Sequence, residues 1–316
     1  MIMFRIGVDL GGTKIAAALI DENDIIKDRL TAATLPERGN DAVTAEIASM
    51  AKRLCEKNGI NISDGVFLGI AAPGAINSDT GCIARAHNLM MESYPMVDKV
   101  RALTGIKNIA IENDANAAAL GEAVAGAAKG TACSVLITLG TGVGGGFVID
   151  GKVFSGFNHT GGEFGHMVLS VGGRRCNCGR RGCWEAYSSA TALVARTKEV
   201  MASDPGSEMH RVAEELGKVN GKVAFIASRR GDKSGTQVVD EYVTYLACGL
   251  VNVINLLQPE VLSLGGGISY EGDGLMIPLQ KKIDEEVFIR GIGRSTEIRI
   301  AKLGNDAGLI GAAHLI

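Results

Sequence analysis

The sequence predicts a two-lobed α/β protein built from duplicated domains, and three observations support this prediction. Apolar strand-like runs alternate with amphipathic helical stretches, which is the pattern of an α/β fold. The length of 316 residues corresponds to about two domains, and a hydrophobic content of 46% is enough to fill a substantial core. Finally, a strand–turn–strand segment in the first half of the chain recurs in the second half.

This repeat is the most informative of the three. Residues 8–13, Val-Asp-Leu-Gly-Gly-Thr, lead to Leu19-Ile-Asp21, and residues 137–142, Ile-Thr-Leu-Gly-Thr-Gly, lead to Val148-Ile-Asp150. The offset between the two copies stays constant, from positions 8 and 137 to positions 21 and 150. The matching turn, strand lengths and closing Asp favour a duplicated domain over two hairpins matched by chance. Two related lobes that face each other form a cleft, where ligands usually bind.

The other elements follow from local patterns. Residues 6–9 and 16–20 flank a glycine turn and are expected to form a hairpin. Apolar positions at helical spacing predict a helix over 42–57, which stops at Asn58-Gly59. Strands are expected at 66–70 and 109–111, and helices at 115–128, 185–202 and 237–257. The polar stretch 203–236 is expected to hold short helical pieces joined by surface loops.

Charge and composition argue against several classes of protein. The 32 basic and 35 acidic residues give a net charge of -3 without a dense basic run, so nucleic-acid binding is poorly supported. No apolar run approaches the ~18 residues that span a bilayer, and the first residues lack the pattern of a signal peptide. The seven cysteines are an odd number spread over a long chain, unlike a secreted disulfide framework. We therefore expect a cytoplasmic protein with no membrane or nucleic-acid partner.

Glycine supplies 43 of the 316 residues, close to twice the ~7% of an average protein. It gathers in three turns, at residues 11–14, 140–146 and 265–267. Glycine backbones turn sharply and can present several N–H groups to one anion. The Walker loop and the dinucleotide fingerprint both lead into a helix, whereas strand-like residues follow the first two turns here, so neither motif fits.

The turns at 11–14 and 140–146 therefore predict two phosphate-binding hairpins, one in each lobe. Asp9 lies beside the first hairpin, where a carboxylate would repel phosphate, so a bridging Mg²⁺ is the simplest explanation. The repeat partner of Asp9 is Thr138, and the second hairpin thus lacks this carboxylate. Plain tight turns would explain any one of the glycine segments, but they explain poorly all three together with Asp9 and Lys14.

Three of the seven cysteines lie within eight residues, Cys176-Asn-Cys178-Gly-Arg-Arg-Gly-Cys183. His166, ten residues upstream, can complete a tetrahedral Cys₃His zinc site. Four protein ligands leave no open position on the metal, which indicates a structural Zn²⁺ rather than a catalytic one. A Cys178–Cys183 disulfide and unliganded thiols are the alternatives, and a reducing compartment argues against the disulfide.

In combination, these motifs resemble the ROK family (repressors, open reading frames and kinases) of sugar kinases, within the actin-like ATPase superfamily. The resemblance covers nearly the whole chain and is greatest to bacterial ROK glucokinases. The cysteine signature with Glu-x-Gly-His is highly specific, whereas the glycine loops alone are not. The matching segments are Asp9-Leu-Gly-Gly-Thr-Lys14, Pro73-Gly74, Glu112-Asn-Asp114, Gly140-Thr-Gly142, Glu163-Phe-Gly-His166, Cys176-x-Cys-Gly-x-x-Gly-Cys-x-Glu185 and Gly265-Gly-Gly267.

The resemblance implies the two-lobed actin-like ATPase (ribonuclease H-like) fold, with duplicated α/β domains and an interlobe cleft. The small lobe would consist of residues 1–113 and the C-terminal helix near 305–316. The large lobe would span residues 114–304 and carry the zinc-binding loop. Sugar binding should close the lobes and exclude water, which is the competing phosphoryl acceptor. The resemblance also implies a homodimer or homotetramer.

The implied activity is that of an ATP-dependent hexose kinase, a glucokinase that phosphorylates the 6-hydroxyl of glucose. Asp114 matches the family's catalytic Asp, the general base for that hydroxyl. From the residues alone Asp114 is better explained as a helix N-cap, and only the family match favours catalysis. The sugar contacts of the family match Asn88, Asn113, Asp114, Glu163, His166 and Glu185. This chain departs from the pattern after Asn88, where it lacks the aromatic residue often found there.

The cofactors implied by the resemblance are ATP, a catalytic Mg²⁺ and a structural Zn²⁺. One ring nitrogen of His166 would bind zinc while the other faces the sugar, and the metal would fix the loop that carries Glu163 and Glu185. Gly266 and Gly267 match the loop on the adenosine side. Asp9 would act through Mg²⁺, and the residues that match the phosphate site are Gly11, Gly12, Thr13, Lys14, Thr141 and Gly142.

Other functions fit the sequence less well. Fructokinase, N-acetylmannosamine kinase and allose kinase share the motifs and stay open as alternatives. A sugar-responsive regulator of the same family would carry an N-terminal winged-helix domain, and only eight residues precede Asp9, so we expect no regulator. An actin- or chaperone-like ATPase would use the phosphate hairpins, but it would have no use for Asn113-Asp114, Glu163 or the cysteine cluster.

Overall fold

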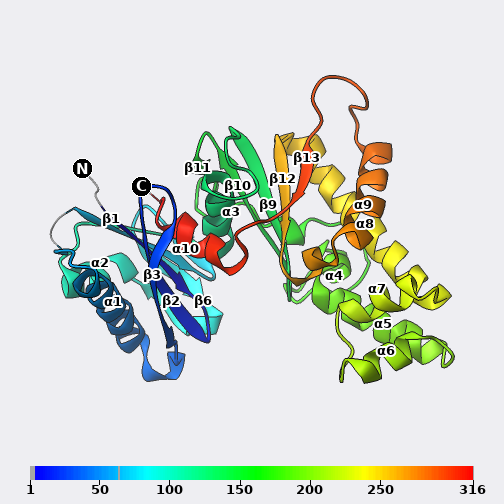
Figure 1. Ribbon diagram of the computed structural model, residues 1–316, viewed down its shortest axis with the longest axis horizontal. Helices are drawn as coiled ribbons and strands as arrows, with labels where there is room; N and C mark the ends of the chain where they lie inside the picture. Colours follow the sequence, from blue (N-terminus) through cyan, green and yellow to red (C-terminus); the bar gives the residue numbers. More distant parts are fainter. Residues whose placement is uncertain (1–3, 63–64, 316) are drawn as a thin grey trace. The chain divides into compact units, whose positions relative to one another are not determined.

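The computed structural model describes residues 4–62 and 65–315, and its first sheet has five strands in the order β3-β2-β1-β4-β8 (Figure 1). Strand β2 runs antiparallel to both of its neighbours, β1 and β3, whereas β1, β4 and β8 are parallel. Every residue of β4 is buried, as is usual for a central parallel strand covered on both faces. The strand bounds are β1 Phe4–Leu10, β2 Lys14–Ile20, β3 Ile26–Ala33, β4 Val66–Ala72 and β8 Asn108–Asn113.

The second sheet repeats this order as β11-β10-β9-β12-β13. Its bounds are β9 Cys133–Leu139, β10 Val143–Ile149, β11 Lys152–Val153, β12 Val261–Gly265 and β13 Glu297–Ile300. As in the first sheet, the outer pair β10–β11 is antiparallel and the pair β12–β13 is parallel. The ends of β9 and β10 follow those of β1 and β2 at one constant offset: 4 and 133, 10 and 139, 14 and 143, 20 and 149. The predicted duplication is confirmed.

The chain forms two compact units, residues 1–136, 146–162 and 302–316 on the one hand and residues 137–145 and 163–301 on the other. The predicted lobes, residues 1–113 with 305–316 and residues 114–304, divide the chain elsewhere and stay a prediction. Residues 1–3, 63–64 and 316 of the predicted small lobe lie outside the described residues.

The helix α1, Asn40–Lys57, packs on the first sheet. Its buried residues Val43, Ile47, Met50 and Leu54 recur every three or four positions and join the main hydrophobic core. Helix α2, Met96–Thr104, contributes Met96, Val97 and Val100 to the same core. A small antiparallel sheet of β5 Ala75–Asn77, β6 Cys82–Ala86 and β7 Met91–Tyr94, which sequence patterns did not predict, lies between β4 and α2 in the chain.

The short helix α10, Ala307–Ala312, lies unusually close to the first sheet and to α3, Asp114–Val124. Gly7 on β1 and Gly69 on β4 pair with each other, and a Cβ atom there would lie 1.9 Å from the Leu309 carbonyl oxygen and 1.7 Å from that of Ala312. These positions therefore require glycine because the helix backbone rests directly on the strands. A Cβ atom on Gly311 would likewise meet the Ala117 carbonyl oxygen at 1.7 Å, so α10 and α3 are also in backbone contact.

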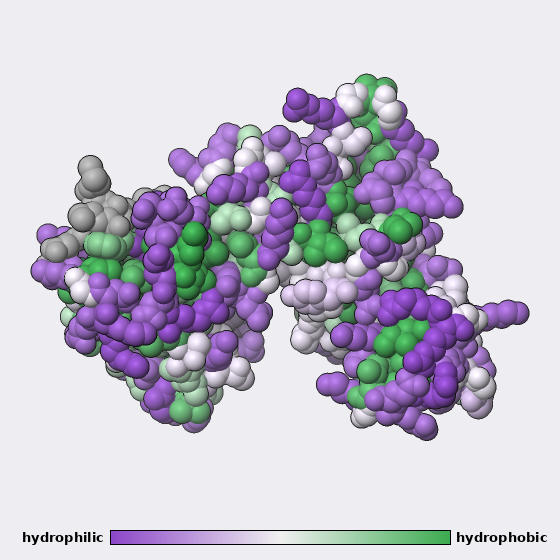
Figure 2. Space-filling view, in the orientation of Figure 1, coloured by the Kyte–Doolittle hydropathy of each residue, from purple (hydrophilic) through white to green (hydrophobic). Residues whose placement is uncertain are grey.

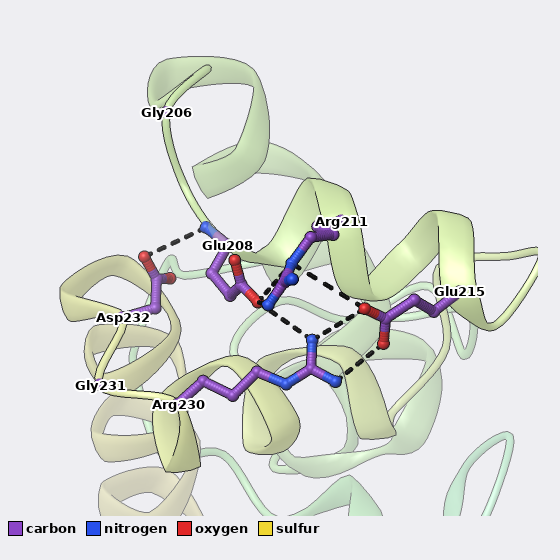
Figure 3. Close-up of a pocket in the computed structure, with 7 residues that line it drawn as sticks. All are labelled: Gly206, Glu208, Arg211, Glu215, Arg230, Gly231 and Asp232. Carbon is purple, nitrogen blue, oxygen red and sulfur yellow. Dashed lines mark hydrogen bonds and ion pairs between the residues drawn. The ribbon is translucent and has the colours of Figure 1, made fainter.

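The second unit carries most of the remaining helices. They are α4 Glu185–Ser188, α5 Ala190–Ser203, α6 Met209–Glu215, α7 Lys222–Arg229, α8 Lys233–Leu257 and α9 Asp273–Glu286. Around α6 and α7 a surface network links Arg230 to Glu208 and Glu215, and Arg211 also pairs with Glu208 (Figure 3). In Figure 2 hydrophobic residues show near the end of α9 and on the loop after it, where Phe288 and Ile292 are mostly exposed.

All four predicted helices have different bounds in the structure, and α1 begins at Asn40 instead of 42. The helix expected over 185–202 is broken at Ser189, whose extended backbone and side chain cap α5 by accepting a hydrogen bond from the Ala192 N–H. Helix α3 ends at Val124 instead of 128, because the Glu122 carboxylate binds the Ala127 N–H and turns the chain. Helix α8 begins at Lys233 instead of 237, with Asp232 as its N-cap. The short helices expected within 203–236 are confirmed as α6 and α7.

Within the described residues, no helix is both long and apolar enough to cross a membrane.

Candidate active site

The first glycine turn joins β1 to β2 and is held by a neighbouring threonine. The Gly11 N–H donates to the Lys14 carbonyl oxygen at 2.9 Å, and Thr34 binds the outer side of the turn. The Thr34 hydroxyl donates to the Gly11 carbonyl oxygen at 2.6 Å, and its N–H donates to the Thr13 carbonyl oxygen at 3.0 Å. Thr13 and Lys14 are exposed. Sequence patterns did not reveal that Thr34 holds this turn, because β2 and β3 separate Thr34 from the turn along the chain.

Asp9 occupies the penultimate position of β1, directly before this turn, and is half-buried. Burial and the negative charge of Asp114 raise the pKa of Asp9 to about 6, and the positive charge of Lys14 opposes the rise. Two carboxylates that repel each other beside a glycine turn are a donor set that suits a hard divalent cation. The raised pKa of Asp9 therefore fits the Mg²⁺ predicted for this residue.

The start of α3 is organised by Glu112 and Asn113, and here one sequence interpretation is wrong. The N-cap of α3 is Asn113, not Asp114: its side-chain oxygen accepts hydrogen bonds from the N–H groups of Ala115 and Asn116 at 2.9 and 3.3 Å. Asp114 is the first residue of the helix and is exposed, and its carboxylate also accepts a hydrogen bond from the Ala115 N–H at 2.8 Å. Both Asp and Asn are good N-caps, so the sequence alone did not decide between two adjacent candidates.

Asn113 also connects the start of α3 to the segment between β4 and β5, because its side-chain amide nitrogen donates to the Gly74 carbonyl oxygen at 3.1 Å. Beneath it lies the buried Glu112 carboxylate, which accepts hydrogen bonds from the Asn113 N–H at 2.8 Å and the Asn116 amide at 3.0 Å. The segments Pro73-Gly74 and Glu112-Asn-Asp114, far apart in the chain, are thus brought together.

Asn88 lies on a short 3-10 helix, His87–Leu89, and is exposed. A Cβ atom on Gly12 would lie 3.2 Å from the Asn88 Cβ atom, so the first glycine turn packs against this predicted sugar contact. The first compact unit therefore holds, on one set of connected elements, Asp9, Gly11, Gly12, Thr13, Lys14, Asn88, Asn113 and Asp114.

The second glycine turn joins β9 to β10 and contacts Glu185, a residue that is predicted to bind the sugar. The Glu185 carboxylate accepts a hydrogen bond from the Val143 N–H at 3.0 Å. A Cβ atom on Gly142 would lie 2.3 Å from the same Glu185 oxygen, so a larger residue at this position would displace the Glu185 carboxylate. Thr141 is exposed at the tip of the turn. The backbone of the turn and the side chain of Glu185 therefore form one local structure.

The four predicted metal ligands converge. The ligand atoms of His166, Cys176, Cys178 and Cys183 all lie within 4.8 Å of one another. The Cys178 and Cys183 sulfurs are 3.7 Å apart, as are the Cys176 sulfur and His166 Nδ1. A tetrahedral site with Zn–S bonds of about 2.3 Å has sulfurs about 3.8 Å apart, whereas a disulfide bond is about 2.05 Å long. The spacing fits a zinc ion and does not fit a Cys178–Cys183 disulfide.

The protonation of these thiols supports the same conclusion. Burial raises the pKa of the Cys176 thiol to about 12 and also raises that of Cys183, while a backbone hydrogen bond from Arg180 lowers the pKa of the exposed Cys178. Buried thiols of this kind ionise readily only beside a cation. The donor set is therefore chemically suited to Zn²⁺.

The two ring nitrogens of His166 face different groups. Its Nδ1 atom lies toward the cysteines, and its Nε2 atom lies 3.9 Å from a carboxylate oxygen of the exposed Glu163. Glu185 in turn contacts the cluster, with 3.5 Å between its carboxylate and the Cys176 sulfur. Glu163 and Glu185 are thus both anchored around one Cys/His cluster.

The third glycine turn follows β12. Gly266 has a φ of 85°, and a Cβ atom there would lie 2.4 Å from the Leu139 carbonyl oxygen, so the fold itself requires glycine. A Cβ atom on Gly267 would have no heavy atom of the described chain within 4 Å. The second unit holds the other predicted site residues, which are Thr141, Gly142, Glu163, His166, Cys176, Cys178, Cys183, Glu185, Gly266 and Gly267.

Two sheets of identical strand order, each with a glycine turn between its first two strands, define the two-lobed actin-like ATPase fold that the sequence predicted. Within this class the chain belongs to the ROK family, whose profile matches residues 5–316. It is 37% identical to a glucokinase of Halalkalibacterium halodurans over 98% of this chain and 94% of the relative. It is 36% identical to a glucokinase of Thermotoga maritima, over 98% and 96%.

The fold is also close to that of a solved relative. A ROK family glucokinase from Streptomyces griseus, solved in complex with glucose and AMPPNP, superposes with a TM-score of 0.79. The two chains are 34% identical, and the match covers 99% of this chain and 98% of the relative.

Proposed function

We propose that this protein is an ATP-dependent sugar kinase, specifically a glucokinase that transfers the γ-phosphate of ATP to the 6-hydroxyl of glucose. The observation that carries the proposal is the start of α3. Asn113 provides the cap, and the Asp114 carboxylate is exposed at the carboxyl end of a parallel strand, the usual place for a ligand-binding residue in α/β folds. The two glucokinase relatives, alike over almost the full chain, support the choice of reaction.

Asp114 is the proposed general base. It would accept the proton of the acceptor hydroxyl as the bond to phosphorus forms. In a loose transition state this proton leaves late, so a carboxylate is a strong enough base. Asn113, whose side chain is fixed by the cap and by Gly74, would orient the sugar beside it.

The two glycine turns would bind the phosphates through backbone N–H groups, with Lys14 supplying positive charge at the first turn. Asp9 would hold Mg²⁺, which supplies charge neutralisation to the phosphates when it is bound. Gly266 and Gly267 would lie against the adenosine. The open space beside Gly267 supports this role, because neighbouring protein atoms do not account for glycine there.

Glu163, His166, Glu185 and Asn88 would bind the remaining hydroxyls of the sugar. When a hexose without a matching hydroxyl binds, the carboxylate or imidazole nitrogen that would contact it stays desolvated and unpaired. The free-energy cost of this unpaired group discriminates among hexoses. The four ligands His166, Cys176, Cys178 and Cys183 would hold Zn²⁺, which fixes the positions of Glu163 and Glu185 when it is bound.

An ATP-coupled assay with glucose, fructose, mannose, N-acetylmannosamine and allose tests the proposal. We expect the highest kcat/KM with glucose, and a product that ³¹P and ¹³C NMR identify as the 6-phosphate. A preference for another hexose would replace glucose as the acceptor and retain the kinase. Equal inactivity toward all five sugars would contradict the proposed activity.

A further inference from the structure

His159 has an unusual backbone conformation for a residue with a side chain. Its φ of 60° lies in the left-handed region, which favours glycine. It belongs to the 155–161 loop, which follows β11 and leads to Glu163. The loop closes on itself through a hydrogen bond of 2.7 Å from the Gly161 N–H to the Ser155 carbonyl oxygen. A bulky residue held in this conformation indicates that its side chain makes contacts that outweigh the strain.

Those contacts are with Asp79 and Ser155. The Nε2 atom of His159 lies 3.1 Å from an Asp79 carboxylate oxygen, and its Nδ1 atom lies 3.4 Å from the Ser155 hydroxyl. The His159 side chain is 14% exposed, whereas that of Asp79 is 84% exposed. One neutral tautomer satisfies both contacts, since Nε2–H donates to the carboxylate and Nδ1 accepts from the hydroxyl. The His159–Asp79 pair therefore joins the 155–161 loop to the β5–β6 turn.

The β5–β6 turn is itself bonded to the start of α3. The Asn77 side chain closes the turn by accepting a hydrogen bond from the Thr80 N–H at 3.0 Å. The Ser78 hydroxyl, next to Asp79, donates at 2.8 Å to the buried Glu112 carboxylate. Glu112 in turn binds the N–H of Asn113, the cap of α3. A continuous chain of contacts thus runs from His159 to the residue before Asp114, all within the first compact unit.

We propose that His159 and Asp79 are positioning residues for the acceptor sugar. The pair fixes the end of the 155–161 loop, four residues before Glu163, to the turn that supports Asn113 and Asp114. In this way the 155–161 loop, which leads to Glu163, is held against the elements of the first unit that carry the proposed base. The inference rests on the proposed function, because it assigns Glu163 and Asp114 to the acceptor site.

His159→Gly separates this role from a general effect on folding. Glycine adopts the φ of 60° found at this position without strain, and the partner Asp79 is mostly exposed, so the melting temperature should stay close to that of the wild type. We expect KM for glucose to rise about tenfold, with KM for ATP changed less than twofold and kcat reduced less than threefold. Asp79→Ala, which leaves the loop backbone unaltered, should give the same pattern.

Two further variants serve as controls. His159→Gln retains an N–H donor for Asp79 and should recover most of the glucose affinity. Asp98→Ala removes another exposed carboxylate, on α2, and should leave all three kinetic constants unchanged. An unchanged KM for glucose in both His159→Gly and Asp79→Ala would overturn the proposal. Equal losses for glucose and ATP would also overturn it, because they would indicate a merely structural role.

Amide hydrogen exchange tests the contact independently of the acceptor. In the wild type the Gly161 amide should be protected, and His159→Gly should increase its exchange at least tenfold. If the wild type phosphorylated no hexose, the proposed function would fail while this measurement still tested the pair. Unchanged exchange in the variant would show that the pair does not hold the loop.

Discussion

The two glycine turns lie at equivalent places in the duplicated sheets. The strands that flank them match, but the side chains at the matching positions differ. The first turn carries Asp9 and Lys14, whereas Thr138 and Val143 occupy the matching positions of the second. Their internal hydrogen bonds differ as well: Gly11 binds Lys14 in the first turn, while Gly140 binds Gly142 at 3.0 Å in the second.

If both turns bind phosphate as proposed, this difference gives them two ways of binding it. The first turn adds ionised side chains to its backbone, and the strand β8 of the same sheet ends beside a further carboxylate, Asp114. In the second sheet Ala301 follows β13 at the corresponding place, and the β9–β10 turn offers backbone N–H groups backed by Glu185. The two sheets share one strand order, and only the first carries the side chains of Asp9, Lys14 and Asp114 at these positions.

The largest effect is expected at Asp114. Asp114→Asn keeps the size of the side chain and removes the proposed base, so kcat should fall about 10³-fold while KM for ATP stays within about threefold. Steady-state kinetics with glucose measure both constants. Glu163→Gln serves as the comparison, because it should raise KM for glucose more than it lowers kcat. A kcat for Asp114→Asn near that of the wild type would rule out its role as base.

Among the described residues, a Cys/His cluster is present only in the second unit. Its removal is expected to have the next largest effect. Elemental analysis should find about one Zn per chain. Cys176→Ser should abolish zinc binding and lower kcat/KM for glucose about 10–100-fold, because Glu163 and Glu185 lose their common anchor. Cys248→Ser, outside the cluster, should retain both metal and activity. A metal-free wild-type protein with full activity would contradict the zinc assignment.

The third glycine turn offers a matched pair of substitutions. Gly266→Ala forces a Cβ atom toward the Leu139 carbonyl oxygen at a φ of 85°, and it should destabilise the protein by about 2 kcal/mol or more. Gly267→Ala meets no described atom, so the melting temperature should not change. If ATP lies against this turn, KM for ATP in Gly267→Ala should nevertheless rise several-fold. An unchanged KM would remove Gly267 from the nucleotide site.

The smallest expected effect is the pH dependence that Asp9 gives to the stability of the folded protein. The folded-state pKa of Asp9 is about 6, above its ordinary value of 3.8, so the folded protein binds this proton more tightly than the unfolded chain. The stability that this proton contributes is therefore lost as the pH rises through about 6. Without nucleotide or divalent cation, Asp9→Asn should melt about 2–6 °C higher than the wild type at pH 8, and the gain should shrink clearly at pH 4.5.

Thr138→Val, at the matching position of the second sheet, is the control for this measurement. It has no ionisable group to lose, so its melting temperature should differ from that of the wild type by the same amount at both pH values. A gain for Asp9→Asn that is also independent of pH would show that burial of its charge is not the cause.

The sequence was sufficient for features that depend on spacing within short segments or on the repeat. The constant offset of the repeat correctly predicted both hairpins, and the spacing of His166, Cys176, Cys178 and Cys183 correctly predicted their convergence. It was not sufficient where distant segments decide the outcome. The choice of Asn113 over Asp114 as the cap depends on Gly74 and Glu112. The pairing of His159 with Asp79 leaves no local pattern at either residue.

The backbone contacts of α10 determine when the first unit can complete its fold during synthesis. Gly7, Gly69 and Gly121 all lie against α10, so the first unit is complete only when residues 307–312 are in place. On the ribosome those residues emerge after the entire second unit, residues 137–145 and 163–301, has been synthesised. During that interval β1 and β4 lack part of their cover, and a ribosome stalled before α10 would present an unfinished domain to chaperones and proteases.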